Sequence, residues 1–132
     1  MELVRTAARA VAALRIGLGV SALVSPALAA RAWVGPSSAG PAGTVLGRAA
    51  GARDVALGAG ALVAARQGAR AERTWVLAGM FCDLVDATTT AANWQRLPAV
   101  GRLLVSGAAV GAAAVGALDG VRGKGGAAAR RS

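Results

Sequence analysis

The sequence predicts an all-α, integral-membrane four-helix bundle with short loops and a disordered basic tail at the C-terminus. Apolar segments of about 20 residues, the length that crosses a bilayer, occur four times in the 132-residue chain. The composition is 55% hydrophobic but only 3% aromatic. Such a chain offers few bulky side chains for a soluble core, while its small residues suit helices that pack closely in lipid. Positive residues are also unevenly distributed between the predicted loops, as in multi-pass membrane proteins.

The first predicted span covers residues 11–34. Arg15 lies one turn inside its start and Arg31 lies near its end. Both long side chains can extend to opposite interfaces of the bilayer, so a span is feasible. Pro26 is expected to kink this helix, because proline lacks the backbone N–H that a helix interior requires.

A cleaved signal peptide is the alternative interpretation of the N-terminal segment. Residues 1–15 would form a basic region, residues 16–25 a short apolar region, and Ala27-Leu28-Ala29 a cleavage site of small residues. Cleavage would leave three spans. The length of the basic region and the apolar character of the remaining chain argue against it.

The second and third predicted spans cover residues 44–65 and 74–93, joined by a charged loop at residues 66–73. The second span follows a turn rich in Pro, Ser and Gly at residues 36–41. A central Arg or Asp costs roughly 2.5 to 3.5 kcal/mol on insertion scales. We therefore expect these two helices to insert because their charged side chains satisfy one another.

The fourth predicted span covers residues 99–118 and follows a turn at residues 94–98. Residues 1–118 would then form one membrane domain. The remaining residues, 119–132, are rich in Gly and basic side chains, a composition typical of a flexible tail.

The positive residues predict the orientation of the bundle. Nine of them belong to the N-terminus, the loop at 66–73 and the tail, whereas the other loops contain Arg31 and Arg96. Because positive residues accumulate in cytoplasmic loops, the prediction is a multi-pass protein of the cell inner membrane with both termini in the cytoplasm. Its expected partners are the lipid bilayer and either a second copy of the chain or another membrane protein.

Charged residues inside the predicted spans are the candidate functional site. Such residues are expensive in lipid and usually functional. At 100° per residue, Asp83 and Asp86 lie on one stripe of the third span, at the same depth as Arg53 on the second, and Arg53 is followed by Asp54. The predicted intramembrane cluster is therefore Arg53, Asp54, Asp83 and Asp86. Candidates for additional partners are Arg15, Arg48 and Arg102.

Two functions follow from this cluster. If its charges only fix the helix register, the protein is non-catalytic and acts structurally or as an accessory subunit of a membrane assembly, which is the leading expectation. If one arginine faces three acids, an excess carboxylate remains for a proton or a cation. The alternative is thus a proton- or cation-coupled transporter of small molecules.

Several other classes are disfavoured by the composition. The chain has no His and a single cysteine, Cys82, so it has no internal disulfide, no Cys-based zinc site and no histidine base. We expect no catalytic residue, no metal, no cofactor and no nucleic-acid partner, and the glycine pairs lack the context of a phosphate loop. Asp83-x-x-Asp86 resembles the start of the metal motif of membrane phosphatidyl-alcohol transferases, but the continuation of that motif is missing.

A broader resemblance covers about residues 5–118. The ordered motifs are Arg15-Ile-Gly-Leu-Gly19, then Gly47-Arg48 with Arg53-Asp54 and Gly58, then Asp83-x-x-Asp86. In this order they resemble small four-helix bacterial membrane proteins of uncharacterised function, broadly the DoxX-like group. The resemblance implies a four-span bundle with no assigned reaction, and a polar signature at Arg53, Asp54, Asp83 and Asp86.

Overall fold

The computed structural model describes residues 2–103, 105–107 and 110–111, and every regular element in these ranges is helical. This confirms the prediction of an all-α fold. Residues 112–118 of the fourth predicted span and the predicted tail at 119–132 lie outside the described residues. The elements are α1 (Glu2–Val24), α2 (Pro26–Trp33), η1 (Pro36–Ala39), α3 (Pro41–Gln67), α4 (Ala69–Ala92) and η2 (Trp94–Arg96), and the described residues from Ala99 onward are also helical.

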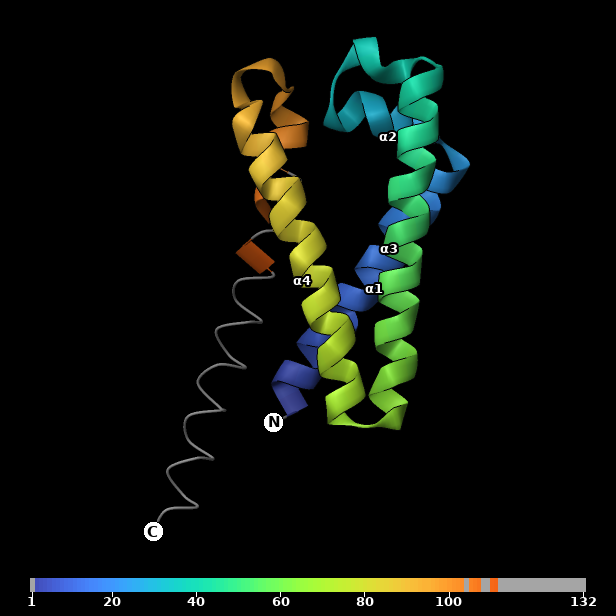
Figure 1. Cartoon of the computed structure of the whole chain (residues 1–132), viewed down its shortest axis with the longest axis vertical. Coiled ribbons are helices and arrows are strands. Elements are labelled where there is room, and N and C mark those ends of the chain that lie inside the picture. Colours follow the sequence, from blue (N-terminus) through green and yellow to red (C-terminus); the bar gives the residue numbers. More distant parts are fainter. Residues whose placement is uncertain (1, 104, 108–109, 112–132) are drawn as a thin grey trace.

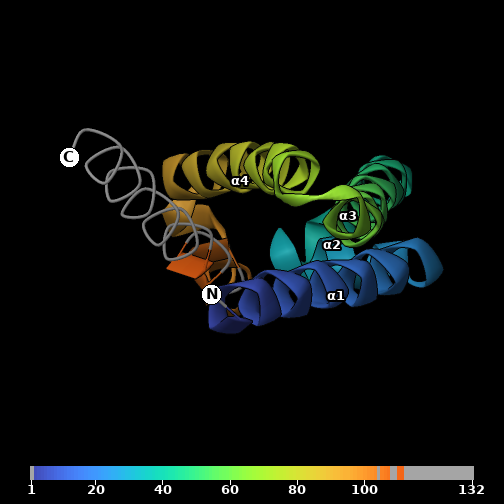
Figure 2. The same ribbon diagram turned by 90° about the horizontal axis from the view of Figure 1, so that it is seen from below.

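The long helices α1, α3 and α4 run along the long axis of the molecule (Figure 1). Helix α3 packs against both α1 and α4. The start of α1 and the turn between α3 and α4 lie at one end of the bundle, which we call the N-terminal end (Figure 1). Helix α2 and η1 lie at the opposite end. Seen along the axis, α1 and α4 stand on different sides of the bundle, with α3 between them at one edge (Figure 2).

The range 11–34 does not form one helix, which corrects the boundaries of the first predicted span. Helix α1 begins at Glu2, nine residues earlier, and ends at Val24. Ser25 leaves the helical region with φ −129° and ψ 63°, and Pro26 then opens α2. Proline disfavours the helical conformation of the residue before it but is well suited to the first turn of a new helix. The expected kink is therefore a complete break, and α2 is a separate helix of eight residues.

The prediction of a charged loop at residues 66–73 is also wrong. Helix α3 continues to Gln67 and α4 begins at Ala69, so Gly68 alone joins them. Gly68 has φ +126°, a conformation that glycine adopts readily and other residues avoid. The flanking Arg, Ala, Glu and Gln residues are good helix formers. Their charges therefore stand on the last turn of α3 and the first turns of α4 and do not form a loop.

Helices α1 and α3 touch through their backbones, because glycines line the contact. A Cβ atom on Gly19 would lie 2.6 Å from the carbonyl oxygen of Gly51, and one on Gly51 would lie 2.7 Å from that of Gly19. Further along, a Cβ on Gly58 would lie 2.6 Å from the carbonyl oxygen of Ala12. This is the close approach that small residues permit between helices in membranes, and it places the middle of α1 beside the middle of α3.

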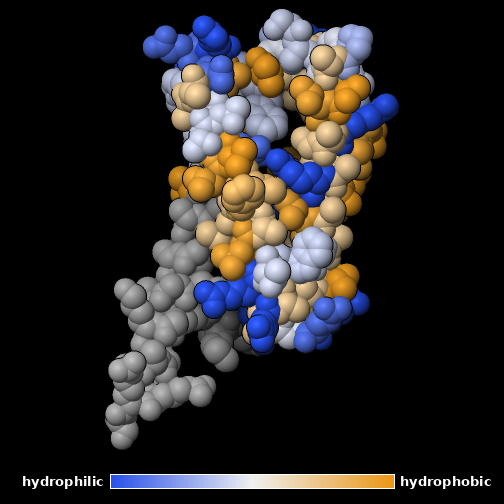
Figure 3. All heavy atoms as spheres, viewed as in Figure 1, coloured by the Kyte–Doolittle hydropathy of each residue, from blue (hydrophilic) through white to orange (hydrophobic). Residues whose placement is uncertain are grey.

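Burial is inverted relative to a soluble protein. In the part of the chain that the structure describes, the buried apolar residues are small, namely Ala12, Ala30, Ala64 and Val105, and no large side chain is fully buried. Large apolar residues such as Leu14, Phe81 and Leu84 are more than 60% exposed, whereas Asp83 is only 9% exposed. Figure 3 shows hydrophobic side chains over much of one face, with hydrophilic ones in a hollow at mid-height.

One described helix is long and apolar enough to cross a membrane by length and composition. It is the stretch Arg5–Val24 of α1, with a mean hydropathy of 1.6. A signal sequence or a buried core helix can be equally long and apolar, although only 11% of this apolar stretch is buried. Helices α3 and α4 are long enough, but their central Arg and Asp residues lower their hydropathy.

Candidate functional site

The candidate site is a network of ion pairs that joins the three long helices at mid-length. Helix α1 contributes Arg15, α3 contributes Arg53 and Asp54, and α4 contributes Asp83 and Asp86. Adjacent residues on a helix point about 100° apart. Asp54 can therefore face α1 while Arg53 faces α4. Asp83 and Asp86 are three residues apart and so share one face of α4.

Arg15 binds two carboxylates at once. Its Nη1 donates to Oδ1 of Asp54 at 3.1 Å, and its Nη2 donates to Oδ2 of Asp83 at 2.5 Å. The Arg15 side chain is 13% exposed and that of Asp83 is 11% exposed, which makes this the most enclosed pair of the network. Charge-assisted hydrogen bonds of this kind are about twice as strong as neutral ones.

Arg53 forms a two-pronged pair with Asp86. Its Nη1 and Nη2 donate to Oδ1 and Oδ2 of Asp86 at 3.2 and 2.6 Å, the fork geometry in which guanidinium matches a carboxylate. Nη2 also reaches Oδ1 of Asp54 at 3.4 Å. The Arg53 side chain is more open than that of Arg15, with 32% exposure, although its Nε is buried and has no hydrogen-bond partner among the described residues.

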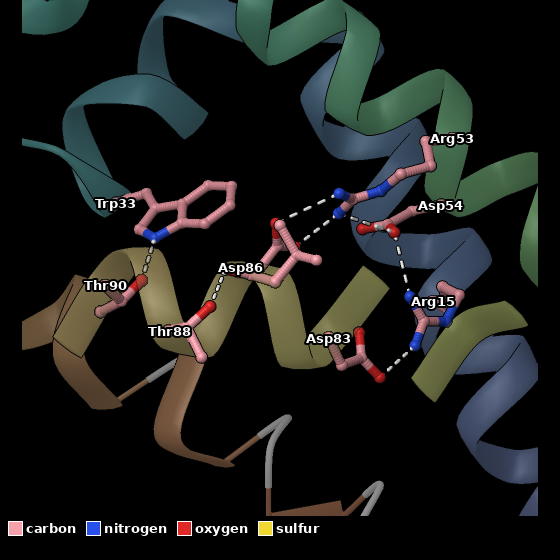
Figure 4. A network of polar contacts seen from close by, with 9 residues as sticks. Arg15, Trp33, Arg53, Asp54, Asp83, Asp86, Thr88 and Thr90 are labelled. Carbon is pink, nitrogen blue, oxygen red and sulfur yellow. Dashed lines mark hydrogen bonds and ion pairs between the residues drawn. The ribbon is translucent and has the colours of Figure 1, made fainter. Parts of the chain in front are cut away.

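The five side chains therefore form one chain of alternating charge, Asp83–Arg15–Asp54–Arg53–Asp86 (Figure 4). Asp54 is its centre, because its Oδ1 accepts from both arginines. Helices α1 and α4 have little backbone contact with each other, so the Arg15–Asp83 pair is a principal link between them.

A polar contact above the network ties α2 to α4. Trp33 Nε1 donates to Oγ1 of Thr90 at 3.4 Å, and Thr90 is only 4% exposed. Figure 4 shows this contact on the side of Asp86 that lies away from Asp83. This contact could not be predicted from the sequence, because nothing in the spacing of α2 indicates that the indole of Trp33 turns inward.

The structure brings together the four residues of the predicted cluster and adds Arg15 from the three candidate partners. Arg102 lies elsewhere. Its Nε donates to the carbonyl oxygen of Leu97 at 2.9 Å, and its guanidinium stands 5.3 Å from the centroid of the Trp94 ring. Arg48 is exposed on α3 and takes no part in the network. The sequence placed Arg15 near an interface because the start of its helix was set nine residues too late.

Space for Arg15 comes from a glycine on α4. A Cβ on Gly79 would lie 3.4 Å from Arg15 Nη2, so alanine would just touch the guanidinium and any longer side chain would press on it. Beside this contact, on the side of the N-terminal end, lies a small pocket of about 50 Å³ between α1, α3 and α4. Arg15 and Asp83 are its charged lining residues, and the remainder of its wall is mainly small or apolar.

The arrangement is one of paired charges. No group of three or more His, Cys, Asp or Glu side chains suited to hold a metal ion occurs in the described part of the chain, and every carboxylate of the network already contacts an arginine. Cys82 is a free thiol of intermediate exposure.

Comparisons with known proteins add no family. No family model, no curated protein and no solved structure matches this chain.

Proposed function

We propose that this chain is a multi-pass integral membrane protein without catalytic activity, which acts structurally or as an accessory subunit of a membrane assembly. The observation that supports this proposal most strongly is the inverted burial. Leu14, Phe81 and Leu84 face outward, while Asp83 and its partners lie between the helices. Large contiguous apolar surfaces are rare on soluble monomers, whereas polar side chains that face the interior of the bundle are the rule in lipid.

The ion-pair network suits a structural role. Each acid has an arginine partner, and the pairs connect α1, α3 and α4. Buried charges of this kind can fix one helix arrangement even where they add little net stability. In the proposed protein, the network sets the register of the three helices, and the small residues between α1 and α3 allow their close contact.

The proposed orientation places both termini in the cytoplasm of a bacterial inner-membrane protein. The N-terminal end of the bundle contains Arg5 and Arg9 of α1 together with the basic residues around Gly68 (Figure 1). The opposite end contains Arg31 of α2 and Arg96 of η2. Positive residues near helix ends favour the cytoplasmic side. A fourth span over residues 99–118 returns the chain to that side, and the DoxX-like group remains the proposed family for the same four-span architecture.

Cysteine labelling in whole cells tests the orientation. In a Cys82→Ala background, we expect Ser37→Cys to react with a membrane-impermeant maleimide added to intact cells with a permeable outer membrane. Gln67→Cys, at the other end of the bundle, should react only after the inner membrane is opened. Both positions are exposed in the structure, so reagent access to the protein is matched.

Extraction of the membranes provides the control. The protein should remain in the membrane pellet at alkaline pH and dissolve in detergent, because its apolar exterior requires lipid. Release by alkali alone would contradict an integral membrane protein. Labelling of Gln67→Cys in intact cells, with Ser37→Cys protected, would instead reverse the orientation and leave membrane integration standing.

A further inference from the structure

The surface of the N-terminal end is strongly basic. Residues 5–9 of α1 and residues 66–73 around the turn between α3 and α4 contain five arginines and one glutamate. All five arginines are exposed, and Figure 3 shows hydrophilic side chains at this lower end of the molecule. The three aspartates of the described helices belong to the ion-pair network at mid-length, so they do not neutralise this end.

Four of these arginines form neither an ion pair nor a side-chain hydrogen bond with the described residues, namely Arg5, Arg9, Arg66 and Arg70. The fifth, Arg73, is engaged in an interaction of its own. Arg5 and Arg9 are four residues apart and share one face of α1, where like charges repel. Arg66 and Arg70 flank Gly68, the single residue between α3 and α4. Anions bound at this end would relieve the repulsion in both places.

The exposed apolar surface begins directly inward from these arginines. Val11 of α1 is exposed and lies two residues inward from Arg9. Val63 of α3 is exposed and lies three residues inward from Arg66. At about 1.5 Å per residue along a helix, the apolar surface starts only about 3 to 5 Å inward from the arginines. A positive layer therefore borders an apolar one on two different helices.

Trp75 marks the same boundary on α4. It is exposed and lies five residues inward from Arg70, a distance of about 7.5 Å along the helix. Its ring packs so closely on Gly60 of α3 that a Cβ atom at that glycine would overlap the indole. Tryptophan is enriched where lipid headgroups meet hydrocarbon. The packing on Gly60 thus fixes an interfacial side chain at the boundary that α1 and α3 also show.

The opposite end of the described bundle has a different order of charge and apolar surface. On α3, the exposed side chains of Val45 and Leu46 lie nearer to that end than Arg48 does. The arginine there stands on the inner side of the apolar residues. Arg31 and Arg96 stand singly on α2 and η2. The layered arrangement is therefore a property of the N-terminal end and does not follow from arginine content alone.

From the unpaired arginines and the apolar boundary beside them, we infer that the N-terminal end binds the phosphate headgroups of anionic phospholipids. Guanidinium groups match phosphate oxygens in a two-pronged geometry, and basic residues next to a bilayer attract anionic lipid. A nucleic acid offers phosphates without an apolar layer beside them, whereas a lipid offers both at this spacing. The inference rests on the proposed membrane function and deepens it, because it names the lipid class that this end prefers.

Electron paramagnetic resonance of spin-labelled lipids tests the full chain in phosphatidylcholine bilayers. Labelled phosphatidylglycerol, which is anionic, is compared with labelled phosphatidylcholine, which has no net charge. Lipid in contact with the protein loses mobility, and the ratio of the two immobilised fractions measures the preference. We expect phosphatidylglycerol to be favoured roughly two- to five-fold, because one cation near an anionic surface contributes up to about five-fold. In about 1 M salt the ratio should approach one, since charges are then screened within about 3 Å.

Variants of three arginines locate the surface. The combination of Arg9→Gln, Arg66→Gln and Arg70→Gln removes one positive charge from each long helix and should bring the ratio close to one. Lysine at the same three positions keeps the charge and should retain most of the preference. Circular dichroism of each sample reports whether the helices have formed.

The opposite end supplies the matched control. The combination of Arg31→Gln, Arg48→Gln and Arg96→Gln removes the same number of exposed charges and should leave most of the preference for phosphatidylglycerol in place. An equal loss of preference in the two glutamine combinations would overturn the inference, because the lipid would then respond to net charge alone.

Equal immobilisation of the two labels by the wild-type protein would also overturn it. A gel shift of a duplex oligonucleotide that depends on the same three arginines, without any lipid preference, would replace lipid by nucleic acid as the partner. Immobilisation of the neutral label reports membrane insertion by itself. Normal immobilisation without preference would therefore refute the lipid surface and leave the proposed function standing, whereas immobilisation of neither label would refute both.

Discussion

Arg15 has a role at the residue scale that no other described side chain duplicates. It is the partner of Asp83 and one of the two partners of Asp54, and it connects α1 to both other long helices. Removing one partner of a buried pair is far more damaging than replacing the whole pair, because the remaining charge is left unpaired. The cost of losing this guanidinium should therefore exceed that of losing any one acid.

We expect Arg15→Gln to lower the free energy of unfolding by about 3 to 5 kcal/mol, the usual cost of stripping a buried charge of its partner. Asp83→Asn should cost less, because Arg15 keeps Asp54 as a partner. Unfolding by sodium dodecyl sulfate in mixed micelles, followed by circular dichroism, measures both. Arg9→Gln on the exposed side of α1 is the matched control, and equal effects of Arg9→Gln and Arg15→Gln would contradict the assigned role.

The charged residues also show what the sequence could and could not predict at this scale. The pairing of Arg53 with the acids of α4 followed from helical periodicity and equal depth, which depend on local geometry alone. The position of Arg15 depended on where its helix begins. Since α1 begins at Glu2 and rises about 1.5 Å per residue, Arg15 lies about 20 Å along it and not near its start. A boundary error of a few turns thus changed its expected environment.

At the scale of elements, glycines mark the contact between α1 and α3 and also occur on the open face of α1. A Cβ on Gly51 would meet the Gly19 carbonyl oxygen at 2.7 Å and the Cβ of Ala22 at 3.0 Å, so the two backbones would have to separate. A Cβ on Gly17, by contrast, would have no neighbouring atom within 4 Å. The same substitution should therefore have opposite effects at these two sites.

We expect Gly51→Ala to destabilise the bundle by about 1 to 3 kcal/mol, the range for overpacked interiors. Gly17→Ala should stabilise it by about 0.5 to 1 kcal/mol, because alanine favours an exposed helix interior. Equilibrium unfolding in the same mixed micelles provides the comparison. If both variants lost stability to the same extent, the close contact between α1 and α3 would be wrong.

The elements themselves were largely predictable, and their ends were not. Apolar runs and turn residues located α3, α4 and the turn at η2 to within a few residues. Two helix junctions were predicted wrongly because each depends on a single residue. Pro26 separates α1 from α2. Gly68 alone reverses the chain between α3 and α4, so the charged residues that were predicted to form a loop belong to the two helices. The Trp33–Thr90 contact could not be predicted because it depends on the direction that α2 takes after the break at Ser25.

At the scale of the whole molecule, two kinds of contact join α1 to the rest of the bundle. It supplies Arg15 to the network and Gly19 to the contact with α3. Cleavage after Ala29 would remove both, and would leave Asp54 and Asp83 without their shared partner. The structure thus gives a physical reason to favour the retained segment over the signal peptide considered in the sequence analysis.

Intact-mass measurement of protein purified from membranes should therefore find the chain without loss of residues 1–29. A mass that corresponds to a chain starting at Ala30 would contradict a structural role for α1.

The paired charges lie far apart in the sequence, so the order of synthesis determines when the ion-pair network can form. Arg15 is synthesised 39 residues before Asp54 and 68 residues before Asp83. At ordinary translation speeds of roughly 5 to 20 residues per second, the wait for Asp83 is on the order of 3 to 14 s. Arg15 has neither acid partner until Asp54 emerges, and it gains its second only with the hairpin closed by Gly68. In the proposed membrane protein, the insertion machinery would have to shield this guanidinium until then.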